Sequence, residues 1–226
     1  MTVLCDHGTR LGTMVTNITE NFAREVKPQQ LRHFFNLHTC NLDNIDLFYQ
    51  DYYENVFMQQ PADFIQLNIE MYSPESIGKK RDWIQKWTKA EHRTFAERFV
   101  AFTAATLIFD TVDFCAVEAF EDIGVLRGLV EATNLMKKHT EVLEDFANFV
   151  HNELLIHAAS PLSIREIICD AAEYELEYAC DITPEEDSFL DRYLLFERIK
   201  KNADKTLYYL GQPPYFHEPT VWRKYY

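Results

Sequence analysis

The residues best suited to chemistry lie in one long apolar stretch, residues 95–120. Asp110 and Asp113 are three residues apart in it, so a helix would place both carboxylates on one face. A buried carboxylate needs a partner, and a divalent cation is one that two carboxylates can share. Asp43 or Asp46 could complete such a relocated cation site. The alternative is that Asp110 and Asp113 pair with Lys or Arg, or lie on a face exposed for dimerisation.

Other candidates have simpler explanations. His151 and His157 are predicted to share one helix, where Glu153 and His157 could hold a metal or only stabilise the helix surface. An acidic cluster after His139, formed by Glu141, Glu144 and Asp145, is explained by a solvated helix face. Cys115 has no His close in sequence, so we expect a packed thiol.

Motifs of the major enzyme classes do not occur in the sequence. It contains no GxSxG, GxxxxGK[ST] or GxGxxG pattern. The 5 cysteines form no CxxC pair, so neither a disulfide framework nor a zinc site is indicated.

The elements that must position these residues are predicted to be helices. The 95–120 stretch has no Gly or Pro and is apolar around most of its circumference, as a central helix is. Thr88 and Glu91 have the spacing of a capping box at its start. Other helices are marked by prolines at their first turn and by two further capping boxes, at 163–166 and 183–186. The expected helices are 11–26, 28–57, 61–71, 74–88, 95–120, 129–157, 164–181 and 184–210, an all-α elongated bundle of about seven or eight helices.

Length and composition indicate a single core. A chain of 226 residues, 47% of them hydrophobic, can bury one sizeable core. We expect a flexible N-terminus at 1–10, a bundle at 11–211 and a C-terminal tail at 212–226. The net charge of -14 repels nucleic acid and anionic membranes. No signal peptide and no uninterrupted apolar span of membrane length is recognised, so we expect a cytoplasmic protein.

Several blocks of sequence resemble the small subunit of class I ribonucleotide reductase. The resemblance implies a ferritin-like bundle, normally a homodimer. In active members this bundle holds a dinuclear iron or manganese centre and a tyrosyl radical. The radical is passed to a large subunit that reduces ribonucleotides. The blocks are NITENFAREV, GKKRDWIQKW, ERFVAF, IFDTVDF, REIICDAAEYELEYACDITP and ADKTLYYLG.

The same resemblance predicts where the metal ligands should lie, and this chain departs from the pattern at each position. An Asp, a lone Glu and two Glu-x-x-His pairs are expected. The radical tyrosine position falls on Tyr49, which we expect to be a core aromatic. The Asp proposed for radical transfer falls on His139. The ligand positions are occupied by Leu11, Leu42, Ile45, Thr106, Thr140 and Leu143.

We therefore expect a relative of the small subunit that has no cofactor, makes no radical and acts by binding. Its expected partner is a second small-subunit chain, in a homodimer or heterodimer. The large subunit is a further candidate partner, but the acidic docking tail that the resemblance implies for this contact is not found, because this chain ends WRKYY. The alternative is a subunit of an active ribonucleoside-diphosphate reductase that depends on a competent partner chain or a relocated metal site. A third is reuse for an unrelated interaction.

Overall fold

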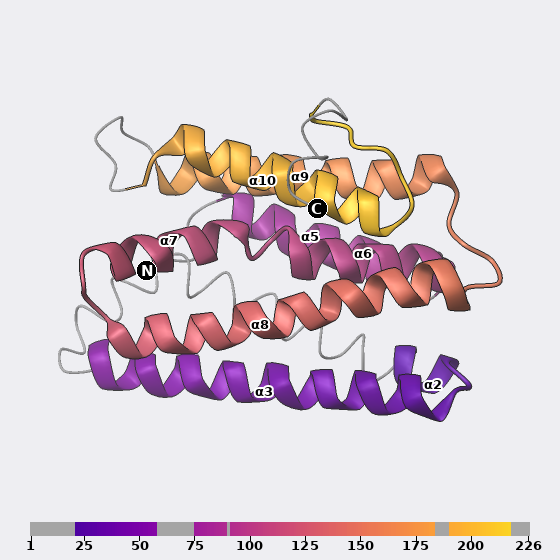
Figure 1. Ribbon diagram of the computed structural model, residues 1–226, viewed down its shortest axis with the longest axis horizontal. Coiled ribbons are helices and arrows are strands. Elements are labelled where there is room, and N and C mark those ends of the chain that lie inside the picture. The colour runs from indigo at the N-terminus through magenta and orange to yellow at the C-terminus, as the bar shows by residue number, and fades with distance from the viewer. Residues whose placement is uncertain (1–20, 58–74, 90, 184–189, 218–226) are drawn as a thin grey trace. The chain divides into compact units, whose positions relative to one another are not determined.

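The computed structural model describes residues 21–57, 75–89, 91–183 and 190–217. Over these residues the regular structure is helical, with no strand, which confirms the all-α prediction. The chain divides into two compact units, residues 1–90 and 91–226. Figure 1 labels their helices.

The first unit contains α2 (Ala23–Glu25), α3 (Gln29–Phe57) and α5 (Glu75–Thr88). α3 and α5 begin directly after a proline, as predicted, because proline fits the opening of a helix, where its missing N–H is not needed. Phe22 packs against Phe35 of α3 with ring centroids 5.3 Å apart. Of the predicted helix at 11–26, only residues from 21 onward are described, and the predicted helix at 61–71 lies outside the described residues.

The second unit is built around α6 (Phe95–Leu107) and α7 (Thr111–Asp122). α8 (Arg127–Phe149) runs back beside them and continues into the π-helical turn η2 (Val150–Leu154). α9 (Pro161–Ile182) and α10 (Arg192–Tyr209) pack together, and both contact α6 and α7 (Figure 1). Eleven of the 13 residues of α6 are buried, which confirms its central place.

The prediction of one continuous helix over 95–120 is wrong. α6 ends at Leu107, and a turn at 108–110 separates it from α7. The backbone N–H of Val112 donates to a side chain of α9, Glu175 Oε1, at 2.9 Å. Because that partner is 63 residues away, the break depends on tertiary structure and leaves no local mark such as Gly or Pro.

The capping box of the central helix lies six residues beyond the predicted one. Glu97 N donates to Thr94 Oγ1 at 3.2 Å, and Thr94 N donates to Glu97 Oε2 at 3.0 Å. Thr88, the predicted cap, is the last residue of α5. Both sites have the Thr-x-x-Glu spacing, so the local pattern alone does not distinguish them.

Two other predicted helix starts also need correction. α9 begins at Pro161, with Ser160 as its cap, rather than at Ser163. α10 begins at Arg192, because Asp191 accepts hydrogen bonds from the first free N–H groups of the helix. Thr183, the predicted cap, instead donates to Ala179 O at 2.6 Å and closes the end of α9.

The helix predicted over 129–157 ends at Leu154. Glu153 and His157 therefore do not share a helix, and the suggested metal pair is not formed by helical spacing. By length and composition, the stretch Phe95–Asp122 could cross a membrane. However, 89% of its most apolar window is buried inside the protein, as is typical of a core helix.

Candidate functional site

Three of the positions that the resemblance assigns to metal ligands lie in the second unit. Thr106 of α6 is buried, and its hydroxyl donates to Phe102 O at 2.9 Å. Thr140 of α8 donates in the same way to Met136 O at 3.1 Å. Leu143, one turn further along α8, is buried and carries only hydrocarbon. The two hydroxyl protons are thus engaged by the helices to which these threonines belong.

These side chains do not fit an iron or manganese centre. Such centres in helical bundles are held by carboxylates and imidazoles from facing helices. A neutral hydroxyl that donates to its own backbone is a poor substitute, and leucine has no lone pair to offer. No step of metal or radical chemistry can be derived through Thr106, Thr140 or Leu143.

Two further positions that the resemblance assigns to metal ligands lie in the described part of the first unit. Leu42 is buried on α3, and Ile45 is half-buried one turn along that helix. Tyr49 follows one further turn along the backbone of α3, and its side chain lies outside the described residues. Leu11 also lies outside them.

The aspartates considered for a relocated cation site are described only in part. Asp110 and Asp113 are buried, with 7% and 6% of their surface exposed. Asp113 Oδ1 accepts from the hydroxyl of Tyr178 at 3.5 Å. Asp43 is exposed on α3, and the side chain of Asp46 is outside the described residues. Among the side chains that the structure describes, no three His, Cys, Asp or Glu residues gather as a metal site would require.

Glu175 is a functional candidate that the sequence analysis missed. Its side chain is completely buried, and Oε1 accepts the backbone N–H of Val112 where α7 begins. A signal for it exists, since Glu175 lies four and seven residues after Ala171 and Ile168, on the apolar face of α9. Glu175 fixes the start of α7, which is a positioning role rather than a catalytic one.

His139, His151 and Cys115 have environments that suppress their charged forms. Burial lowers the pKa of His151 and of His139 below the usual value. His157 is exposed beyond the end of η2. Burial raises the pKa of the Cys115 thiol to about 11, so the reactive thiolate is scarce at neutral pH. This supports the prediction of a packed thiol.

The acidic cluster of α8 is only partly a solvated face. Glu141 and Asp145 are exposed, as predicted. Glu144 is not, because 15% of its side chain is exposed and it binds Lys205 Nζ at 2.7 Å. Glu144 Oε2 also accepts from the hydroxyl of Tyr209 at 3.1 Å. This carboxylate therefore joins α8 to α10.

The described start of the C-terminal tail is attached to the second unit. Asp204 of α10 is completely buried. Asp204 Oδ1 accepts the backbone N–H groups of Tyr215 and Phe216, at 2.6 and 2.9 Å. Asp204 Oδ2 lies 2.8 Å from Nδ1 of His217. A single carboxylate thus holds three successive residues.

Comparisons with known proteins identify the family. The family model described as "Ribonucleotide reductase, small chain" matches residues 9–222. The ribonucleoside-diphosphate reductase small chain of Trypanosoma brucei brucei is 25% identical over 206 residues, which cover 91% of this chain and 60% of the relative. The small chain of Nicotiana tabacum is 26% identical over 200 residues, 88% of this chain and 60% of the relative. The human subunit M2 is 26% identical over 200 residues, 88% of this chain and 51% of the relative. The chain thus spans about half to three fifths of the length of these curated relatives.

Solved structures show the same fold. The Rnr4 homodimer of the Saccharomyces cerevisiae ribonucleotide reductase aligns with a TM-score of 0.77 at 22% identity, covering 92% of this chain and 69% of that chain. The R2 subunit of the Clostridium botulinum ribonucleotide reductase aligns with a TM-score of 0.79 at 14% identity, covering 99% and 74%. These likenesses confirm the predicted ferritin-like helical fold. Together with the match over residues 9–222, they show that the chain belongs to the small-chain family of ribonucleotide reductase.

Proposed function

We propose that this chain is a non-catalytic member of the small-chain family that holds no di-metal centre, generates no radical and acts by binding another protein. The observation that carries the proposal is the state of Thr106 and Thr140. Their hydroxyls donate to backbone carbonyls of their own helices at positions where active relatives are expected to present carboxylates.

Loss of the ligands is compatible with a stable bundle. A di-metal site keeps several carboxylates close together in the low-dielectric interior, where like charges repel strongly. Replacing buried ionic groups with apolar residues is often neutral or stabilising. Leu42 and Leu143, both buried, are replacements of this kind. On this proposal, the helices are held together by apolar packing and not by a metal ion.

A second small-subunit chain is the proposed partner, in a homodimer or a heterodimer with an active subunit. The Rnr4 structure to which this chain is similar is a homodimer. We place the protein in the cytoplasm, as expected for a ribonucleotide reductase component. The bundle is proposed to span residues 11–211 and to be followed by a tail at 212–226.

Affinity purification of the tagged chain from its native cell, at native abundance, tests the partner. We expect a small-subunit chain with a complete ligand set to copurify in near-equal amount, or light scattering of the pure protein to give the mass of a dimer. Recovery of neither reductase subunit, with a monomer in solution, would contradict the proposal and favour reuse for another interaction.

A second candidate function is a subunit of an active ribonucleoside-diphosphate reductase. Its support is that the curated relatives are named as small chains of that enzyme. The two candidates differ in one assay. If the chain is added to a purified reductase, an active subunit restores ribonucleotide reduction when the competent small chain is absent. A non-catalytic chain does not, although it can change the activity of the competent chain.

A further inference from the structure

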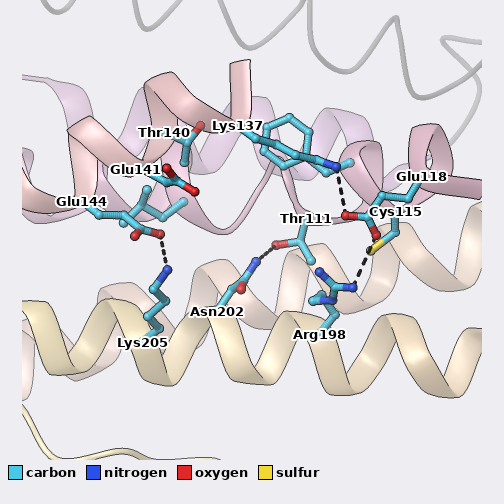
Figure 2. Close-up of a pocket in the computed structure, with 12 residues that line it drawn as sticks. Thr111, Cys115, Glu118, Lys137, Thr140, Glu141, Glu144, Arg198, Asn202 and Lys205 are labelled. Atoms are coloured by element: carbon cyan, nitrogen blue, oxygen red, sulfur yellow. Dashed lines mark hydrogen bonds and ion pairs between the residues drawn. The ribbon is translucent and has the colours of Figure 1, made fainter. Parts of the chain in front are cut away.

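A cavity of about 230 Å³ lies within the second unit, between α7, α8 and α10. Twelve residues line it, and six of them are charged (Figure 2). Leu107, Phe114 and Cys115 supply apolar lining. The volume is below the range of about 300 to 1,000 Å³ that is usual for drug-sized ligands, so an occupant must be small.

One end of the cavity has a surplus of positive charge. Lys137 Nζ lies 2.9 Å from Glu118 Oε1, and Arg198 Nη2 lies 3.3 Å from Glu118 Oε2. Two cations therefore share one carboxylate. Arg198 uses a single nitrogen for Glu118 and its side chain is 51% exposed, which leaves other donors of its planar fork for a second anion.

The other end has a surplus of negative charge. Lys205 binds Glu144, and Glu141 lies beside them on α8 (Figure 2). Two carboxylates line this end with one ammonium group, and Lys205 binds only Glu144 of the two. Thr111 and Asn202, joined by a hydrogen bond of 2.8 Å, lie between the two ends (Figure 2).

The same two helices set the separation of the ends. On α8, Lys137 and Glu144 are seven residues apart, as are Arg198 and Lys205 on α10. At a rise of 1.5 Å per residue, seven residues correspond to about 10 Å along each helix. The side chains of these four residues extend into the cavity, so the space between the two charged ends is shorter than the distance along the helices. A ligand whose opposite charges are only a few bonds apart would fit in this space.

We propose that this cavity binds a small zwitterion whose anionic and cationic groups are joined by a short apolar chain. The anionic group binds Arg198 and Lys137, and the cationic group binds Glu141 and Glu144. The linker between them contacts Phe114 and the other apolar lining. A lone anion or a lone cation fits less well, because it meets like charge at one end. The proposal is independent of the proposed function, since it needs neither a metal nor a partner protein.

Ligand-detected NMR and calorimetry with 5-aminopentanoate test this proposal on the full chain. In its extended form the charged groups of this compound are roughly 6 Å apart. Because partly exposed ion pairs are individually weak, we expect a Kd of about 1 mM that increases with salt. Pentanoate and pentylammonium each lack one charge, and glycine lacks the spacing, so each should bind at least about tenfold more weakly, a loss of about 1.4 kcal/mol.

Two variants, Arg198→Gln and Glu141→Gln, address the two ends separately. Both residues are exposed, so the fold should tolerate the changes. Each should weaken 5-aminopentanoate binding by about fivefold, as expected for loss of one partly exposed ion pair. The matched controls, Lys201→Gln on α10 and Glu131→Gln on α8, are exposed and outside the cavity lining, and should leave the Kd unchanged.

The outcome is decisive in either direction. Saturable binding that requires both charges and is weakened by both cavity variants supports the proposal. Absence of saturable binding, equal binding of pentanoate, or equal effects of cavity and control variants would overturn it. The six charges would then be an ion-pair network that only holds α7, α8 and α10 together.

Discussion

Replacing Glu175 tests how the central helix is divided. The carboxylate is completely buried, and its Oε1 accepts the backbone N–H of Val112 at 2.9 Å. Glu175→Ala leaves that N–H without this acceptor and leaves a cavity where the side chain was. A buried N–H that is left without its acceptor costs about 1 to 3 kcal/mol, and the deleted methylene groups add to this. We expect the free energy of unfolding to fall by about 2 to 4 kcal/mol.

Glu175→Gln keeps an oxygen acceptor at this position and replaces the carboxyl group with an amide. The amide oxygen still accepts from Val112, so we expect a loss of about 1 kcal/mol, smaller than that of the alanine variant. The matched control is Glu173→Ala, an exposed residue on the same helix, which should change stability by less than about 0.5 kcal/mol.

Urea unfolding followed by far-UV circular dichroism measures these differences. Hydrogen exchange provides a local measurement, because the amide of Val112 should exchange faster in Glu175→Ala. The reasoning is refuted if Glu175→Ala costs no more than Glu173→Ala, or if exchange at Val112 is unchanged.

Three further predictions follow from buried groups. Because burial raises the pKa of Cys115 from 9.0 to about 11, iodoacetamide at pH 8 should label it about a hundredfold more slowly than the same thiol in unfolded protein; equal rates would contradict this. Asp204→Ala removes the acceptor of Tyr215 and Phe216, so chymotrypsin should cleave after these residues sooner than in the parent protein; unchanged cleavage would count against it. Burial lowers the pKa of His151 below its ordinary value of 6.5, so the unfolded state binds the proton first, and the free energy of unfolding falls as pH drops from 6.5 towards the lower pKa of the folded state. His151→Gln should flatten the corresponding fall in unfolding free energy, and an identical pH profile would refute it.

The sequence predicted those parts of the fold that local signals determine. Prolines marked the starts of α3 and α5, and the continuous apolar character of 95–107 marked the buried helix. The break after Leu107 was missed because its stabilising contact, Val112 with Glu175, joins residues 63 positions apart. The capping box was misplaced because Thr-x-x-Glu occurs twice between 88 and 97, and local spacing does not reveal which copy begins a helix.

For the candidate site, too, the sequence predicted residue positions but not their contacts. The assignment of residues to ligand positions stays a prediction, because it depends only on the resemblance to the family. The engagement of the Thr106 hydroxyl and the burial of Glu144 against α10 could not be read from the sequence. Both depend on which face of a helix meets a neighbour, and for Glu144 that neighbour is Lys205, 61 residues away.

Metal content is the most direct test of the central claim that this chain assembles no di-metal centre. The purified protein is loaded anaerobically with Fe(II) or Mn(II), exposed to dioxygen, desalted and analysed by mass spectrometry of the metals and by electron paramagnetic resonance. We expect fewer than about 0.1 ions per chain and no tyrosyl radical signal, because hydroxyl and hydrocarbon side chains do not replace carboxylate and imidazole ligands. Roughly two ions per chain, as a di-metal bundle holds, would contradict the account.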